Sequence, residues 1–152
     1  MFVCDKELRA VFKIDIKTNM VIKRVDVPNG EPWKVSLNKN YVVVTDTLRH
    51  SLNVYEVETM ALLKDTIIEQ PDGKNGPFAV AITNDNLIFV KNYPDKQLVL
   101  LNFDLTEQVL FKDRRVRSGI QGFTLLECFN QTLVVGVAEK KGVYKLICYA
   151  NV

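Results

Sequence analysis

The fold is decided by a short motif that recurs at a fixed spacing, as Pro32-Trp33-Lys34-Val35, Pro77-Phe78-Ala79-Val80 and Gly122-Phe123-Thr124-Leu125. Both steps are 45 residues long. Each copy is followed by a polar turn and an apolar run, of which Asn38-Lys39-Asn40 before Tyr41–Val44 is one example. A fixed period of this length indicates a repeat architecture, in which each unit packs on its neighbours.

Each period contains four short runs typical of β-strands and no helical periodicity. In one period the runs are Trp33–Leu37, Tyr41–Thr45, Leu52–Glu56 and Ala61–Ile67. Val, Ile, Leu, Phe and Tyr dominate the runs, whereas Asn, Asp, Gly, Pro and Thr separate them. The first two runs are nearly continuous in apolar residues, which predicts burial on both faces. The pattern predicts β-propeller blades; a β-sandwich is the alternative, but it does not require this period.

The repeats resemble two known propeller repeats. Two stretches are similar to the NHL-type repeat: Val42–Thr47 with Leu52–Tyr55, and Phe2–Asp5 with Ala10–Ile14. A third stretch, Pro32–Ser36 followed by Asn40–Thr45, resembles the YVTN-type repeat. The resemblance implies a propeller like the C-terminal domains of TRIM-NHL ubiquitin ligases, which bind RNA or protein. The same family includes extracellular modules, lyases and lactonases, so the fold alone does not assign a function.

Strand counting predicts an incomplete ring in one all-β domain, residues 1–152. The chain begins in a second strand (Phe2–Cys4) and ends after a third strand (Val143–Tyr149), so two full blades stand between two partial ones. The expected blade bounds are 1–29, 30–69, 70–116 and 117–152. The terminal blades should expose apolar faces and unpaired edges, which favour self-association. The residues expected on these exposed faces are Val11, Ile14, Leu133, Val135 and Leu146.

Composition excludes several classes of protein. The 152 residues are 47% hydrophobic and 25% charged, with a net charge of +2, which is typical of a globular domain and excludes a disordered chain. This charge does not by itself indicate a nucleic-acid or membrane partner. No apolar run reaches about 18 residues and no signal peptide is visible. We therefore expect a cytoplasmic protein, or a piece of a larger one, with no membrane contact.

No motif indicates catalysis, a metal or a cofactor. Cys4, Cys128 and Cys148 lack the paired spacing of zinc ligands and lie in or beside apolar runs, so we expect buried free thiols. His50 is the only histidine, and we interpret it as a solvated loop residue. On the expected innermost strands, Glu127 is the one acidic residue, which gives little support to a metal at a channel mouth. We predict no catalytic residue, no metal and no cofactor.

One basic cluster supplies the candidate binding residues. Arg114, Arg115 and Arg117 fall in the connection before the fourth blade, where we expect one face of loops. The candidate residues on that face are Arg49, His50, Lys96, Arg114, Arg115 and Arg117. Such a face could bind phosphates, as in the RNA-binding NHL domains that the resemblance implies. Acidic residues on the same loops largely offset its charge.

These observations predict a non-catalytic protein-interaction scaffold with a protein partner. An RNA-binding module that uses the basic loop face is the first alternative, and a propeller hydrolase or lyase with a metal at the channel mouth is the second. The repeat also predicts that Trp33, Phe78 and Phe123 occupy equivalent positions on three innermost strands, buried between adjacent blades.

Overall fold

The computed structural model describes residues 1–68, 77–92, 98–106, 108–111, 122–129, 131–140 and 143–150. The first sheet contains β1 (Phe2–Asp5), β2 (Ala10–Asp15) and β3 (Met20–Asp26). The second contains β4 (Pro32–Leu37), β5 (Tyr41–Asp46), β6 (Ser51–Glu56) and β7 (Leu62–Ile67). The third contains β8 (Pro77–Ile82), β9 (Ile88–Asn92), β10 (Leu98–Leu101) and β11 (Gln108–Phe111). The fourth contains β12 (Gly122–Phe129), β13 (Thr132–Lys140) and β14 (Val143–Ala150).

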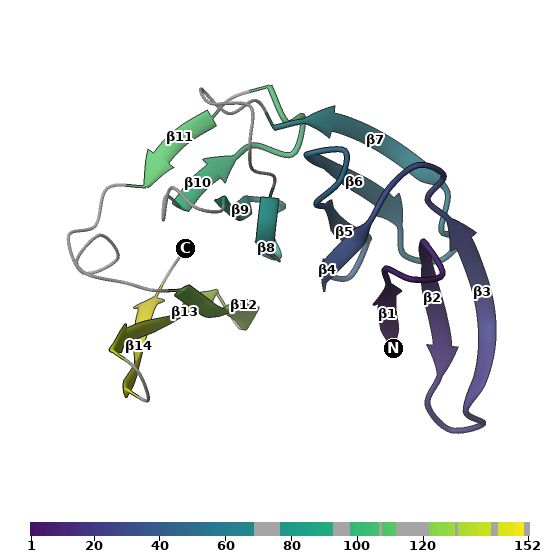
Figure 1. Cartoon of the computed structure of the whole chain (residues 1–152), viewed down its shortest axis with the longest axis horizontal. Helices are drawn as coiled ribbons and strands as arrows, with labels where there is room; N and C mark the ends of the chain where they lie inside the picture. The colour runs from purple at the N-terminus through teal and green to yellow at the C-terminus, as the bar shows by residue number, and fades with distance from the viewer. Residues whose placement is uncertain are drawn as a thin grey trace.

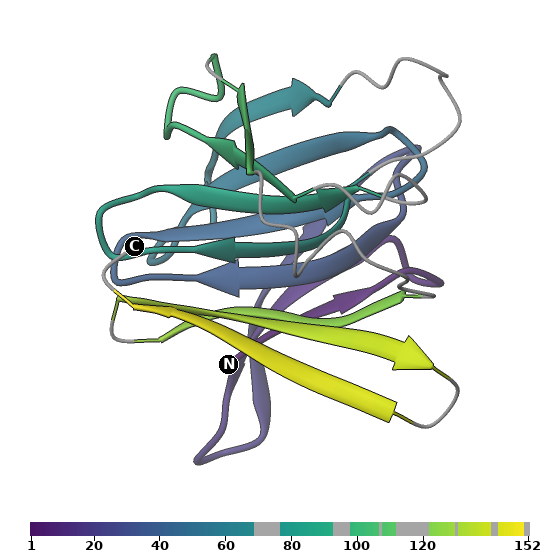
Figure 2. The same ribbon diagram turned by 90° about the vertical axis from the view of Figure 1, so that its left-hand side faces the viewer.

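The four antiparallel sheets follow one another along an open arc (Figure 1). Their first strands, β1, β4, β8 and β12, lie on the inner side of the arc, and each contacts the next. Figure 2 shows the strands of neighbouring sheets in layers, with β12–β14 below β8–β11. Two four-stranded sheets between two three-stranded ones confirm the predicted all-β arrangement. None of the residues described forms a helix long and apolar enough to cross a membrane.

Three apolar clusters fill the spaces between neighbouring sheets. The first and second sheets enclose Val11, Val27, Val42, Val44, Tyr55 and Met60. The second and third enclose a larger group that includes Val43, Leu52, Val54, Val80, Ile82, Ile88 and Val90. The third and fourth enclose Ala79, Ala81, Phe89, Leu98, Leu133, Val135 and Ile147. Because an interior sheet packs on both faces, three successive residues of β5, Val42–Val44, are all buried, as the continuous apolar run predicts.

The turn between the second and third strands of a full repeat is closed by an aspartate. In the first sheet, Asp5 Oδ1 accepts the backbone N–H of Leu8 at 2.9 Å. In the second, Asp46 Oδ1 accepts the backbone N–H of Arg49, also at 2.9 Å. Aspartate is favoured in such turns because its short side chain reaches nearby backbone donors. The two hydrogen bonds are 41 residues apart in the sequence.

The same two turns end on residues with a left-handed backbone. The φ angle is 48° at Arg9 and 56° at His50, a conformation uncommon for residues other than glycine. The carbonyl of Arg9 accepts the N–H of Val27, and that of His50 accepts the N–H of Ile68, both at 2.8 Å. These bonds hold the outer strand of each sheet at its end. Position 50 therefore has a backbone role that Arg9 performs equally well in the first sheet.

The exposed faces of the terminal sheets differ from those predicted. Val11, Leu133 and Val135 are fully buried, because they face the neighbouring sheet rather than the open end. Leu146 is 64% exposed, as expected, and Ile14 is half-buried. Successive side chains of a strand point to opposite faces. Since both faces of these strands are apolar, the sequence does not show which alternate set faces outward.

Two further expectations are met only in part. Trp33 lies on the innermost strand β4, but it is half-buried rather than buried. The side chains of Phe78 and Phe123 lie outside the described residues, although their strands are innermost as predicted. Cys4 and Cys128 are half-buried and Cys148 is exposed, so the expectation of three buried thiols is wrong for Cys148.

Candidate binding surface

The predicted basic face is described only at Arg49 and His50. These residues lie in the turn between β5 and β6, whereas Lys96, Arg114, Arg115 and Arg117 lie outside the described residues. Arg49 Nη2 lies 2.5 Å from Asp65 Oδ2 of β7. This ion pair offsets the charge that a phosphate would need. His50 is half-buried, and its place is set by the left-handed turn described above.

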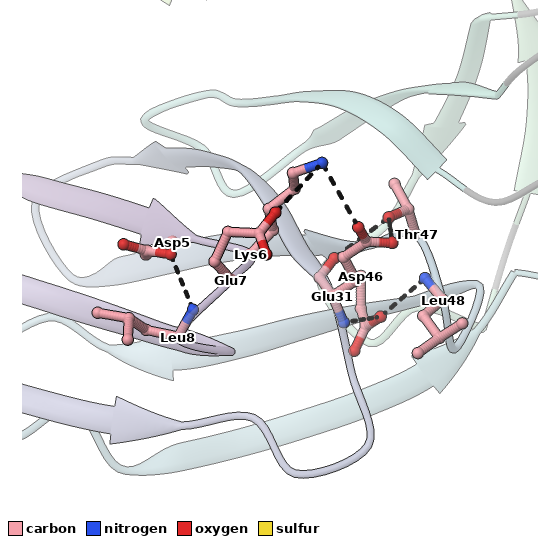
Figure 3. Close-up of polar contacts among 8 residues, drawn as sticks. All are labelled: Asp5, Lys6, Glu7, Leu8, Glu31, Asp46, Thr47 and Leu48. Atoms are coloured by element: carbon pink, nitrogen blue, oxygen red, sulfur yellow. Dashed lines mark hydrogen bonds and ion pairs between the residues drawn. The ribbon is translucent and has the colours of Figure 1, made fainter.

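A cluster of polar side chains next to this turn joins the first sheet to the second (Figure 3). Lys6 Nζ lies 3.9 Å from Glu31 Oε1 and 3.8 Å from Glu7 Oε1. The backbone N–H of Thr47 donates to the Glu31 carbonyl at 3.1 Å, and the Thr47 hydroxyl donates to Glu31 Oε2 at 3.3 Å. Lys6 Nζ also lies 5.4 Å from the centre of the Trp33 ring. Exposed contacts of this kind are individually weak. Because several of them meet at Glu31, together they help to fix the connection before β4.

Asp46 is the buried centre of this region. Its Oδ1 accepts backbone N–H groups of Glu31 at 2.9 Å, Leu48 at 3.1 Å and Arg49 at 2.9 Å. Its Oδ2 has no hydrogen-bond partner among the described residues. A Cβ atom at Gly30 would overlap Oδ2, so the backbone already fills the space beside this oxygen. The carboxylate therefore holds the backbone before β4 and in the turn after β5.

Lys34 of β4 acts electrostatically on groups of two other sheets. Lys34 of β4 is exposed, and its positive charge partly offsets the effect of burial on both Glu127 of β12 and Cys4 of β1. Burial raises the pKa of Cys4 to about 12 and also raises the pKa of Glu127. Among the described residues, no group of three or more His, Cys, Asp or Glu side chains could hold a metal ion.

The free face of the first sheet carries apolar side chains, together with Arg24, whose guanidinium carbon lies 5.8 Å from the centre of the Phe12 ring. Val3 pairs with Phe12 across β1 and β2, and Ile14 pairs with Val21 across β2 and β3. Cross-strand partners share a face, and this face is opposite to the one on which Val11 packs against the second sheet. Val3, Phe12 and Ile14 are half-buried although no further sheet covers them in the described chain.

The free face of the fourth sheet is more exposed. Leu133, Val135 and Ile147 pack on the third sheet, so the alternate residues of β13 and β14 face outward. Leu146 and Phe129 are 64% and 72% exposed. The prediction included Leu146 but missed Phe129. Counting alternate positions from the pair Phe129–Thr132 across the turn could have identified it.

Comparison with known proteins identifies the fold. No model of a protein family matches the chain, and no curated protein matches it in sequence. Among solved structures, a nidogen/laminin complex matches with a TM-score of 0.72 and 13% identity, over 98% of this chain and 56% of that one. Virginiamycin B lyase from Staphylococcus aureus matches with a TM-score of 0.66 and 12% identity, over 96% of this chain and 50% of the lyase.

The chain is part of a β-propeller. A catalytically inactive variant of the same lyase, solved with quinupristin, gives a TM-score of 0.63 at 13% identity. At such identities the likeness establishes the fold and not an activity. The chain spans about half the length of each of these structures. Each four-stranded sheet is a blade, and the three-stranded sheets are the first and last blades of the arc.

Proposed function

We propose that this chain is a non-catalytic protein-interaction module made of NHL-like propeller blades, and that it binds through the free faces of its terminal blades. The observation that carries the proposal is the exposure of Leu146, 64%, on a blade face whose counterparts between the interior blades are buried. Apolar patches exposed on a folded domain are typical of protein interfaces. The structural likeness to a propeller in a nidogen/laminin complex supports the proposal.

The NHL-like assignment is supported by the role of its aspartate. In both copies of the pattern, Asp5 and Asp46 accept backbone N–H groups of the following turn. These are structural roles, which suit a scaffold. The RNA-binding alternative gains no support from Arg49, because its guanidinium group is paired with Asp65.

The proposal is tested by quantitative affinity capture from cells of the source organism. The chain, a Leu146→Glu variant and a Leu62→Glu control are compared, because Leu62 is also exposed, at 54%, but lies on the outer strand of an interior blade. We expect specific proteins to bind the chain and the control, and to bind the Leu146→Glu variant about tenfold less. Binding unchanged in the variant, or lost after ribonuclease treatment, would contradict a protein-binding end face.

A further inference from the structure

The two free faces of the chain are the two halves of one blade-to-blade joint. At each interior joint, one face of a blade meets the opposite face of the next blade. In the second blade, Val44 and Tyr55 lie on the face that receives the preceding blade, and they are 0% and 3% exposed. Their equivalents in the first blade, 41 residues earlier, are Val3 and Ile14. The first blade therefore presents a receiving face that no blade covers among the described residues.

The fourth blade presents the other half. Tyr149 pairs with Leu133, just as Tyr55 pairs with Val42. Leu133 and Val42 each face the preceding blade. By this register, Leu146 corresponds to Leu52, three positions before Tyr55. Leu52 is fully buried in the joint between the second and third blades. Leu146, at the same position, is exposed because no further blade covers it in the described part of the chain.

We propose that the occupant of both faces is a second copy of this chain, with the fourth blade of each copy packed on the first blade of the other. This inference rests on the proposed function, since it names the partner of the same faces. Two copies contain about as many residues as one of the similar solved chains, of which this chain covers 50% and 56%. The opening of the arc lies between the first and fourth blades (Figure 1). Head-to-tail contacts related by a two-fold rotation close into a ring.

The joint between the first and second blades also predicts a specific contact across the new one. Lys13 of the first blade donates to the carbonyls of Val57 and Glu58 in a turn of the second blade, at 2.9 and 3.2 Å. By strand register, Cys148 in the fourth blade is equivalent to Lys13 in the first blade. Lys17 has the position of Glu58, 41 residues earlier. The thiol of Cys148 in one copy should therefore lie near Lys17 of the other copy.

Sedimentation velocity of the purified chain at tens of micromolar tests the ring. The expected mass is twice the 17.4 kDa of the chain. Ile14→Glu and Leu146→Glu should each give monomers, whereas an equimolar mixture of the two variants should associate again, because one unmodified joint can then form. Val21→Glu is the matched control, since Val21 pairs with Ile14 but its equivalent in the second blade, Leu62, stays 54% exposed. Circular dichroism checks that every variant retains its sheets.

A thiol-to-amine crosslinker with a short spacer provides an independent measurement. In a mixture of isotopically labelled and unlabelled chains, mass spectrometry should find Cys148 joined to Lys17 between copies. A monomeric wild-type chain would overturn the ring, even if affinity capture still shows another protein on Leu146, in which case the proposed function stands. Dimers that survive Ile14→Glu with its sheets intact, open polymers, or a dimer without the Cys148–Lys17 link would also overturn it.

Discussion

Lys13 Nζ lies 2.9 Å from the carbonyl oxygen of Val57, and this hydrogen bond joins the first blade to the second. The ammonium group is largely sheltered, with 19% of the Lys13 side chain exposed. Replacing Lys13 by Met keeps the apolar stem and removes the donor. We expect Lys13→Met to lower the free energy of unfolding by about 1–3 kcal/mol, as for a charged hydrogen bond. Urea denaturation measures it. Lys23→Met, on the neighbouring exposed strand position, should change stability by less than about 0.5 kcal/mol.

Removing the Asp46 carboxylate should be among the most damaging single changes. Asp46→Ala leaves the N–H groups of Glu31, Leu48 and Arg49 without their acceptor. We expect a loss of about 3–5 kcal/mol, because each unsatisfied buried donor carries a desolvation cost. Asp46→Asn retains Oδ1 and should lose less. A midpoint of denaturation equal for Asp46→Ala and wild type would show that these bonds contribute nothing.

Gly30 should tolerate no side chain. Alanine at this position would place its Cβ against Asp46 Oδ2 and 2.5 Å from Val27 Cγ1. Both neighbours are buried, so the chain between β3 and β4 must shift. We expect Gly30→Ala to destabilise the protein by about 1–3 kcal/mol, as overpacking does. Thermal melting measures the loss, and Lys39→Ala is the comparison, because Lys39 is exposed and does not have the left-handed backbone that makes alanine unfavourable at Asn29. If Gly30→Ala melts no earlier than Lys39→Ala, the close packing is wrong.

Stability should fall as the solution becomes alkaline. Burial raises the pKa of Cys4 from 9.0 to about 12 and that of Tyr55 from 10.0 to about 12. Below about pH 9, both groups are protonated in the folded and unfolded chains, and neither affects stability. Above it, the unfolded chain releases protons that the folded chain keeps, so unfolding becomes easier by at most about 1.4 kcal/mol per pH unit for each group.

Urea titrations at pH 8, 9, 10 and 11 test this dependence. Cys4→Ala should reduce the decline above pH 9, whatever its effect on stability at pH 8. Cys148→Ala is the control because Cys148 is exposed, and its decline should match that of the wild type. An unchanged slope in Cys4→Ala would mean that the Cys4 thiol does not carry the dependence.

The order and limits of the strands could be predicted from the sequence because each strand is a compact apolar run between turn residues. The predicted run Tyr41–Thr45 differs from β5 by one residue. The outward face of the terminal blades could not be predicted in the same way. Val11 and Phe12 are neighbours and both apolar, yet one packs on the second blade and the other faces outward. Only the register with a neighbouring blade distinguishes them.

The candidate binding residues were less accessible to sequence reasoning. The pairing of Arg49 with Asp65 depends on two strands that meet only in the folded sheet. The role of His50 could have been suspected, because aligning Asp5 on Asp46 in the two NHL-like stretches places Arg9 at the position of His50. A position that accepts both side chains is defined by its backbone rather than by side-chain chemistry.

Because the inner strands contact one another in chain order, β1 to β4, β4 to β8 and β8 to β12, the three joints act as links in series. The first and last strands belong to opposite ends of the arc. A force applied at the two ends would therefore load every joint equally, and the weakest would part first while the others held, as in other linear repeat arrays. Extension of the single chain should proceed in separate steps, one blade at a time, instead of in one rupture.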